Sequence, residues 1–162
     1  ATLRPDGTAD RDALAAVSPV AFRDGESWSD IFSRILSEKV EPQLGNGRIT
    51  VLYEYPAVEA ALARTTERDA RVAERFELYA CGVELANGFG ELTDADEQRR
   101  RFIAEMDVKE QTYGERYPID EELLEALAMM PPASGVALGL DRLVMLATGA
   151  TRIDQVLWTP AV

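Results

Sequence analysis

The feature that most restricts the fold is the alternation of apolar and polar residues in RFELYACGVELANGFGEL, residues 75–92. A period of two is typical of strands that bury one face. A turn signal near Cys81 divides the segment, which predicts two antiparallel strands joined by a tight loop. If Ala80 and Cys81 form that loop, Glu77 lies directly across the ladder from Glu84 on the same face.

Helix and strand signals surround this hairpin. An amphipathic helix is expected from Trp28 to before Pro42. Hairpins with helices between them, rather than regular β-α-β alternation, predict an α+β fold in which helices flank an antiparallel sheet. The other expected elements are a strand at 49–55, helices at 97–111, 121–130 and 141–148 (the last capped by Asp141), and strands at 134–139 and 153–158.

The length of 162 residues predicts one domain, since domains commonly hold about 100–200 residues. Hydrophobic residues make up 46% of the chain, which is enough for a packed core and excludes disorder. Residues 1–26 are rich in Ala, Asp, Gly and Pro, and they predict a weakly structured lead-in to a domain that spans 1–162.

Composition excludes several classes of function. The net charge of −12 repels nucleic-acid backbones and anionic lipids. The chain has no histidine and one cysteine, Cys81, so it cannot build a histidine-dependent triad, an imidazole or thiolate metal site, or an internal disulfide. The remaining carboxylates, arginines and backbone donors suit Mg²⁺ or cationic substrates.

Targeting signals are missing from the sequence. No run approaches the about 18 apolar residues of a membrane span. The first ten residues have neither the basic head nor the apolar stretch of a signal peptide. We therefore expect a cytoplasmic protein with no membrane partner.

Two glutamates of the hairpin are candidate metal ligands. Like charges opposite each other on a sheet are destabilising unless a cation lies between them, and Mg²⁺ bound to ATP phosphates would supply that charge at Glu77 and Glu84. The alternative is that both glutamates lie on a hydrated sheet face and tolerate each other. The pattern alone leaves both interpretations open.

Further polar and small residues could bind ligands. Asn87 can donate to a carboxylate, and Glu91 among apolar neighbours would select an ammonium, although NG is also an ordinary turn. Small residues at 135, 137 and 139 share one face of a strand, where a flat ligand could approach the backbone, or where a helix could pack. Arg142 can reach a phosphate or stack on a ring.

Taken together, residues 75–102 and the later block SGVALGLDRLVMLATGA resemble the C-terminal half of a class II lysyl-tRNA synthetase catalytic domain. The second block matches class II motif 3. Within that group, the sequence most resembles the elongation factor P lysine ligases, which are truncated paralogues of lysyl-tRNA synthetase. The resemblance extends from about Trp28 to the end of the chain.

The resemblance implies roles for individual residues. Glu77 and Glu84 would hold the Mg²⁺ of ATP, and Asn87 and Glu91 would bind the carboxylate and the side-chain ammonium of lysine. The nucleotide would lie against Gly139, with Arg142 as the catalytic arginine of motif 3 contacting adenine and the γ-phosphate. Activation of an amino acid by ATP depends on positioning and charge neutralisation, so the lack of histidine is no obstacle.

The resemblance also indicates a substrate preference. The elongation factor P ligases carry alanine where this chain has Ala137, which is associated with (R)-β-lysine, whereas the lysyl-tRNA synthetases usually carry glycine. One added methyl group can reshape a pocket, since a methylene contributes about 1–3 kcal/mol to discrimination. We therefore expect a ligase that forms lysyl- or β-lysyl-adenylate and transfers it to a lysine of elongation factor P.

Two alternatives remain open: a lysyl-tRNA synthetase fragment, for which tRNA would be the partner, and a non-catalytic synthetase-like binding domain. Class II motif 1, which makes the dimer interface, and motif 2, whose arginine binds the α-phosphate, are absent from these 162 residues. We therefore expect the chain to be inactive alone and the intact protein to be a homodimer. A larger residue often replaces Gly90 in relatives, which suggests a looser ammonium pocket near Glu91.

Overall fold

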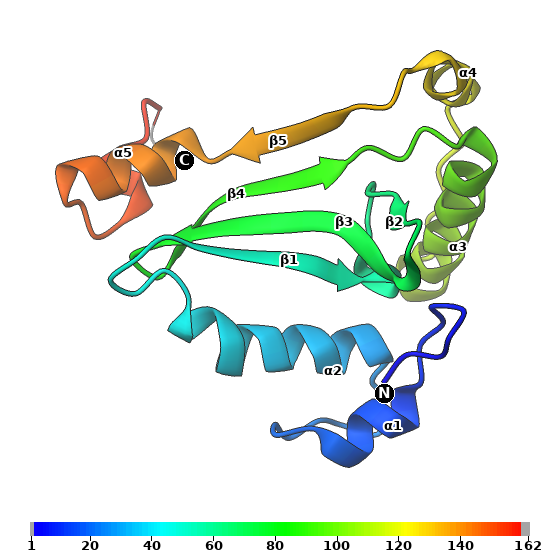
Figure 1. The fold of residues 1–162 in the computed structure, drawn as a ribbon, viewed down its shortest axis with the longest axis horizontal. Coiled ribbons are helices and arrows are strands. Elements are labelled where there is room, and N and C mark those ends of the chain that lie inside the picture. Colours follow the sequence, from blue (N-terminus) through cyan, green and yellow to red (C-terminus); the bar gives the residue numbers. More distant parts are fainter. Residues whose placement is uncertain (1, 160–162) are drawn as a thin grey trace.

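The computed structural model describes residues 2–159, which form an antiparallel sheet with helices around it. The strand order is β1-β3-β4-β5, and the short β2 pairs with β3 (Figure 1). The strands are β1 (Thr50–Pro56), β2 (Thr65–Thr66), β3 (Asp69–Ala80), β4 (Val83–Gly90) and β5 (Ser134–Leu138). The helices are α1 (Arg11–Val17), α2 (Trp28–Ile35), α3 (Ala95–Tyr113), α4 (Glu121–Met129) and α5 (Leu140–Thr148). The α+β prediction is confirmed.

The predicted hairpin is β3 and β4, but its loop lies one residue later than expected. Ala80 pairs with Val83, so the loop is Cys81 and Gly82. Both loop residues have positive φ, at 52° and 74°, as a type I′ turn requires. Gly82 meets this requirement without a steric cost, which explains why the chain turns there.

A β-bulge follows the loop and changes the partner of Glu77. The register shifts between Leu78 and Tyr79, so that Tyr79 pairs with Glu84 while Glu77 pairs with Asn87. The prediction that Glu77 lies directly opposite Glu84 is therefore wrong. Because Tyr79 and Glu77 are two residues apart on one strand, Glu84 nevertheless shares the face of Glu77.

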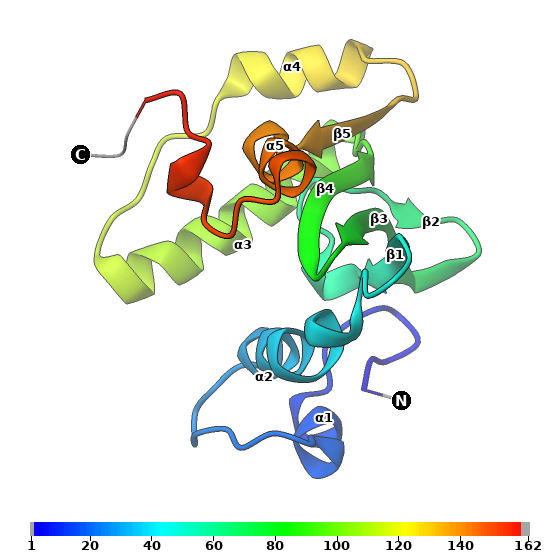
Figure 2. The ribbon, with the colours of Figure 1, turned by 90° about the vertical axis from the view of Figure 1, so that its left-hand side faces the viewer.

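Helices α1 and α2 lie together at the β1 side of the molecule (Figures 1 and 2). Ser27 caps α2 in a capping box with Asp30, and the buried side chains of Leu14, Trp28 and Ile31 form a small core between the two helices. After Ile35 the helix continues as one π-helical turn, Leu36–Val40, and one 3₁₀ turn, Glu41–Gln43. These turns lead the chain back to the sheet.

The C-terminal elements differ from prediction in two places. Helix α5 begins after Gly139, which provides no side-chain cap, so Asp141 lies in the first turn and does not cap the helix as expected. The expected strand at 153–158 is also wrong, because residues Ile153–Gln155 form a 3₁₀ turn. The side chain of Gln155 accepts hydrogen bonds from the backbone of Thr151 and Arg152, and such local bonds compete with strand pairing.

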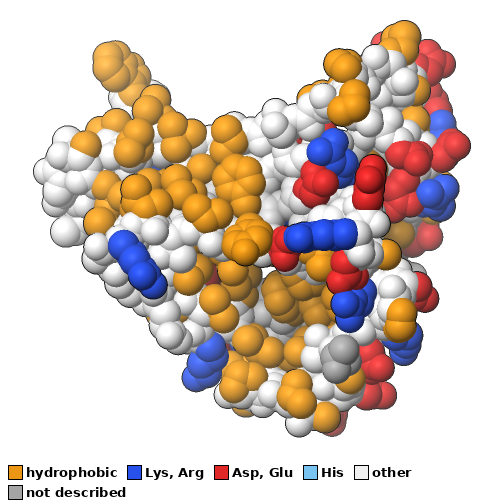
Figure 3. All heavy atoms as spheres, viewed as in Figure 1, with side chains coloured by type: hydrophobic (Ala, Val, Ile, Leu, Met, Phe, Trp, Pro, Cys, Tyr) orange, Lys and Arg blue, Asp and Glu red, His pale blue; other side chains and the backbone are white. Residues whose placement is uncertain are grey.

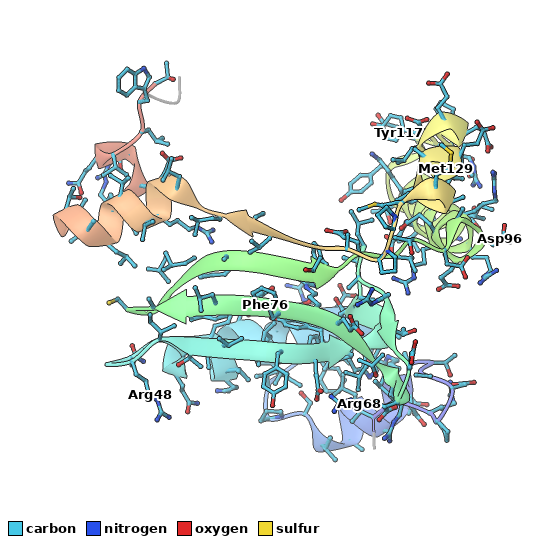
Figure 4. All side chains as sticks on the ribbon, turned by 45° about the horizontal axis from the view of Figure 1, so that its top comes forward. Arg48, Arg68, Phe76, Asp96, Tyr117 and Met129 are labelled. Atoms are coloured by element: carbon cyan, nitrogen blue, oxygen red, sulfur yellow. The ribbon has the colours of Figure 1, made fainter. Side chains whose placement is uncertain are left out.

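The two faces of the sheet differ in polarity. One face carries two apolar rows, and Figure 3 shows hydrophobic side chains gathered over the sheet and over α5 in this view. Figure 4 shows Phe76 of the second row midway along β3. The opposite face carries the hairpin glutamates Glu77 and Glu84. The rows are Val51, Leu78, Ala86 and Leu138, and Tyr53, Phe76, Gly88 and Val136.

None of the helices described is both long and apolar enough to cross a bilayer.

Candidate functional site

Strand register brings the predicted site residues to the polar face of the sheet. Across β3, β4 and β5, Glu77 pairs with Asn87, and Asn87 pairs with Ala137. Glu84 lies on this face as well, two pairs closer to the hairpin loop. Side chains that come from three strands thus converge, as the resemblance to a synthetase site implies.

Glu77 is the best-buried acid of this face, with 6% of its surface exposed. Its Oε2 accepts hydrogen bonds from the hydroxyl groups of Tyr55 and Tyr79, the latter at 2.7 Å. Its Oε1 accepts a hydrogen bond from Arg75 Nη2 at 2.9 Å. Burial, and then the hydrogen bond to Glu77, raises the pKa of each tyrosine above its ordinary value. Both hydroxyl groups therefore remain donors at neutral pH.

Arg75 is itself fixed in place. Its guanidinium lies 4.4 Å from the ring centroid of Tyr55 and donates to the backbone oxygen of Glu59 at 2.7 Å. A cation over an aromatic face, with its side chain only 17% exposed, is held more firmly than a surface arginine. Sequence reasoning missed this role, because the contact between β1 and β3 residues depends on register.

Glu84 is joined to the start of α5. Arg142 Nη1 donates to the backbone oxygen of Glu84 at 2.8 Å and lies 3.2 Å from its carboxylate. The Gly139 N–H donates to the backbone oxygen of Leu85 at 2.8 Å, so the start of the helix is tied to β4. The predicted nucleotide residues Gly139 and Arg142 are therefore adjacent to the predicted metal ligand Glu84.

A third acid, Glu41, reaches this region from the 3₁₀ turn before β1. Burial, and then the charges of Glu77 and Glu84, raises the pKa of Glu41 above the ordinary glutamate value. No sequence pattern could have identified this neighbour, because the position of Glu41 depends on the two irregular turns after α2. Within residues 2–159, no group of three or more His, Cys, Asp or Glu side chains is arranged to hold a metal ion.

Asn87 and Glu91 form fewer polar contacts within the protein than Glu77 and Glu84 do. The Oδ1 atom of Asn87 is buried and has no hydrogen-bond partner among the described residues. None of the ion pairs among those residues includes Glu91. The carboxylate of Glu91 lies over Gly135, which is on the same face as Ala137. Both side chains are therefore available to a ligand.

The expectation for Gly90 is corrected by its position. A Cβ atom at Gly90 would point to the other face of the sheet and meet the carboxylate of Glu74, which pairs with Arg64 at 2.7 Å. Because Glu91 points to the polar face, the size of residue 90 does not act directly on an ammonium pocket there.

Two cavities lie near the sheet but apart from part of the predicted site. A cavity of about 840 Å³ lies between the 57–62 segment and α3, and a second of about 770 Å³ lies near Arg64 and Phe76. Neither cavity is lined by Glu84, Glu91 or Arg142. The residues that the sequence singles out share a face, and these two cavities do not enclose them.

Comparison with known proteins identifies the family of this chain. The family model for "tRNA synthetases class II (D, K and N)" matches residues 33–162. Proteins named "Elongation factor P--(R)-beta-lysine ligase" from Salmonella arizonae and Enterobacter sp. are each 46% identical to this chain over 157 residues, which is 96% of the chain and 48% of each relative. The protein of that name from Salmonella gallinarum is 45% identical over the same length. The chain thus spans about half the length of the curated relatives it matches. By sequence and by its antiparallel sheet with flanking helices, the chain belongs to the class II tRNA synthetases of the D, K and N group.

Proposed function

We propose that this chain forms part of an ATP-dependent ligase that activates lysine or (R)-β-lysine as an aminoacyl-adenylate. The ligase then transfers the aminoacyl group to a lysine of elongation factor P. The observation that carries the proposal is the convergence of Glu77, Glu84, Asn87 and Ala137 on one sheet face. The names of the relatives support the acceptor, and we expect the complete protein to act in the cytoplasm as a homodimer.

The donor set on this face fits a Mg²⁺ ion bound to ATP. Two hydrogen bonds occupy Oε2 of Glu77, but its Oε1 accepts only one, from Arg75, and keeps a free lone pair. Glu84, whose side chain is 34% exposed, also has oxygen capacity beyond its contact with Arg142. One or two carboxylates with phosphate oxygens are the usual ligands of Mg²⁺ in such sites. When bound, the ion neutralises charge on the phosphates.

Asn87 and Glu91 are proposed to bind the amino acid. The Nδ2 group of Asn87 can donate to the substrate carboxylate, and the carboxylate of Glu91, which forms no ion pair among the described residues, can bind the side-chain ammonium. Arg142, at the start of α5, would turn from Glu84 towards the adenine and the γ-phosphate. Holding both substrates in this way places the attacking carboxylate oxygen near the α-phosphate, which is the main contribution that positioning makes to catalysis.

Ala137 is proposed to set the preference for (R)-β-lysine. It pairs with Asn87 on the polar face, so its methyl group stands beside the proposed carboxylate site. A displaced amino group, as in a β-amino acid, would occupy this region differently from an α-amino group. We expect Ala137→Gly to improve use of α-lysine relative to (R)-β-lysine, by about 10-fold or more.

Amino-acid-dependent ATP-pyrophosphate exchange by the complete gene product tests this proposal. We expect exchange with (R)-β-lysine and transfer to elongation factor P. Glu91→Gln should raise the KM for the amino acid about 100-fold with little change in the KM for ATP, because the charge partner of the ammonium is lost. Glu74→Gln, on the opposite face, is the matched control. Preference for α-lysine with charging of tRNA would instead indicate a lysyl-tRNA synthetase, and no exchange at all would indicate a binding domain.

A further inference from the structure

Two glycines of the sheet have a glutamate carboxylate pressed against them, one on each face. A Cβ atom at Gly135 would lie 2.5 Å from Oε1 of Glu91, and a Cβ atom at Gly90 would lie even closer to Oε2 of Glu74. Such contacts are far shorter than van der Waals distance, so a methyl group at either position would displace the carboxylate. Only the first pair lies on the face of Asn87 and Ala137.

The backbone of Glu91 is held on two sides. Its N–H donates to the backbone oxygen of Ala133 at 3.0 Å, and an isolated bridge joins Glu91 to Ala63. The following residue, Leu92, donates to Leu62 at 3.0 Å. Because these bonds fix the main chain, the position of the carboxylate is decided by the side-chain torsions and by what the side chain meets.

Glycine at position 135 is not required by backbone conformation. The glycines with positive φ do not include Gly135, which pairs in regular register with Phe89 inside β5. A residue with a side chain could adopt this strand geometry. The space above Gly135 is instead filled by Glu91, so steric exclusion is the physical reason for glycine here.

We propose that Gly135 is a positioning residue for substrate selection: its missing side chain allows Glu91 to lie flat on β5, where its carboxylate binds the side-chain ammonium of the amino acid. This inference rests on the proposed function. It assigns to Gly135 a role different from the close approach of a flat ligand, because the group that approaches the backbone is the carboxylate of Glu91.

Gly135→Ala in the complete gene product tests the proposal. We expect the KM for lysine or (R)-β-lysine in ATP-pyrophosphate exchange to rise about 10-fold to 100-fold, since displacement of about 1 Å has effects of that size. The KM for ATP should change by less than about 3-fold, and the melting temperature should be nearly unchanged. A crystal structure of the variant should show the Glu91 carboxylate moved from its present position.

A double-mutant cycle separates displacement from other effects. Glu91→Asp shortens the side chain by one methylene and should raise the KM for the amino acid by itself. When Glu91→Asp is combined with Gly135→Ala, it should raise the KM for the amino acid much less than it does in the unaltered protein, because the shorter side chain does not collide with the new methyl group. Additive effects of the two changes on KM would overturn the proposal.

Gly90→Ala is the matched control, because it places the same methyl group against a carboxylate on the other face. We expect it to leave the KM for the amino acid unchanged. An equal rise in KM, or an unmoved Glu91 in the crystal structure of Gly135→Ala, would overturn the role of Gly135 while leaving the proposed function intact. Absence of amino-acid-dependent exchange in the unaltered protein would overturn both.

Discussion

The carboxylate of Glu77 is satisfied by three donors that come from β1 and β3, namely Tyr55, Tyr79 and Arg75. A buried charge of this kind is stable only while its donors remain, because desolvation is otherwise uncompensated. At the scale of single residues, this network therefore links the stability of the sheet centre to the orientation of a proposed metal ligand.

Removing either tyrosine hydroxyl should destabilise the protein. We expect Tyr55→Phe and Tyr79→Phe each to lower the free energy of unfolding by about 1.5–3 kcal/mol, the usual range for a hydrogen bond to a charged group. Urea-induced unfolding followed by circular dichroism measures this change. Tyr53→Phe, on the other face with 65% of the residue exposed, should change stability by less than about 0.5 kcal/mol. Equal effects at all three positions would contradict the network.

Glu41 should make stability depend on pH. Because the pKa of Glu41 is raised, the folded state favours the protonated carboxyl group. The contribution of this group to folding stability is therefore complete at pH values below the ordinary glutamate pKa. It is lost as the pH rises through the raised pKa. We expect Glu41→Gln to stabilise the protein by about 0.5 kcal/mol at pH 7 and to have no such effect at pH 4. Thermal melting at both pH values measures this. A gain of the same size at pH 4 would show that charge is not the cause.

The sequence allowed us to predict which side chains lie on the same face of the sheet, but not which side chains from distant segments contact one another. Alternation along the hairpin correctly placed Glu77 and Glu84 on one face, although the bulge changed their pairing. The partner Tyr55 depends on strand register, and the neighbour Glu41 depends on two irregular helical turns. Such contacts arise between segments far apart in the sequence, where periodicity carries no information.

Among the structural elements, the β3–β4 hairpin has an unfavourable residue in its turn. Cys81 has φ of 52°, a region that costs a residue with a side chain about 1–2 kcal/mol, whereas asparagine tolerates it best after glycine. We expect Cys81→Asn to raise the free energy of unfolding by about 0.5–1 kcal/mol. Urea-induced unfolding measures this change in the free energy of unfolding.

The matched control for this turn is Cys81→Val, which should destabilise the protein because a β-branched residue is strained at positive φ. Cys81 is exposed, so neither change alters a buried contact. Similar stabilities for the asparagine and valine variants would contradict the assignment of a type I′ turn.

Elements with strong local signals were predicted well. Helices α2, α3 and α4, which the sequence predicts, begin at the side-chain caps Ser27, Asp94 and Asp120, and side-chain capping is a local interaction. The strand expected at 153–158 failed because Gln155 bonds to nearby backbone instead of to the sheet. Residues 153–158 do not pair with another strand, and local hydrogen bonds therefore determine their structure.

At the scale of the whole molecule, the sheet separates two different surfaces. One face gathers Glu77, Glu84 and Asn87, and the other exposes Tyr53 at 65% and Val136 at 61%. Exposed apolar residues in rows across four strands are unusual for the surface of a monomeric protein. The exposed apolar face fits a chain that spans about half the length of its relatives.

We therefore expect these 162 residues alone to show no amino-acid-dependent ATP-pyrophosphate exchange. A Mg²⁺ ion held by Glu77 and Glu84, together with Arg142, would neutralise charge on the outer phosphates, but no arginine of a motif 2 type is present to bind the α-phosphate, where charge develops during adenylate formation. Losing one such electrostatic contact typically costs about 100-fold to 1000-fold in rate. Exchange should be measured for this chain and for the complete gene product under the same conditions, with Glu84→Gln in each as the control for contaminating synthetase. Activity of the short chain that Glu84→Gln abolishes would show that the polar face is a complete site.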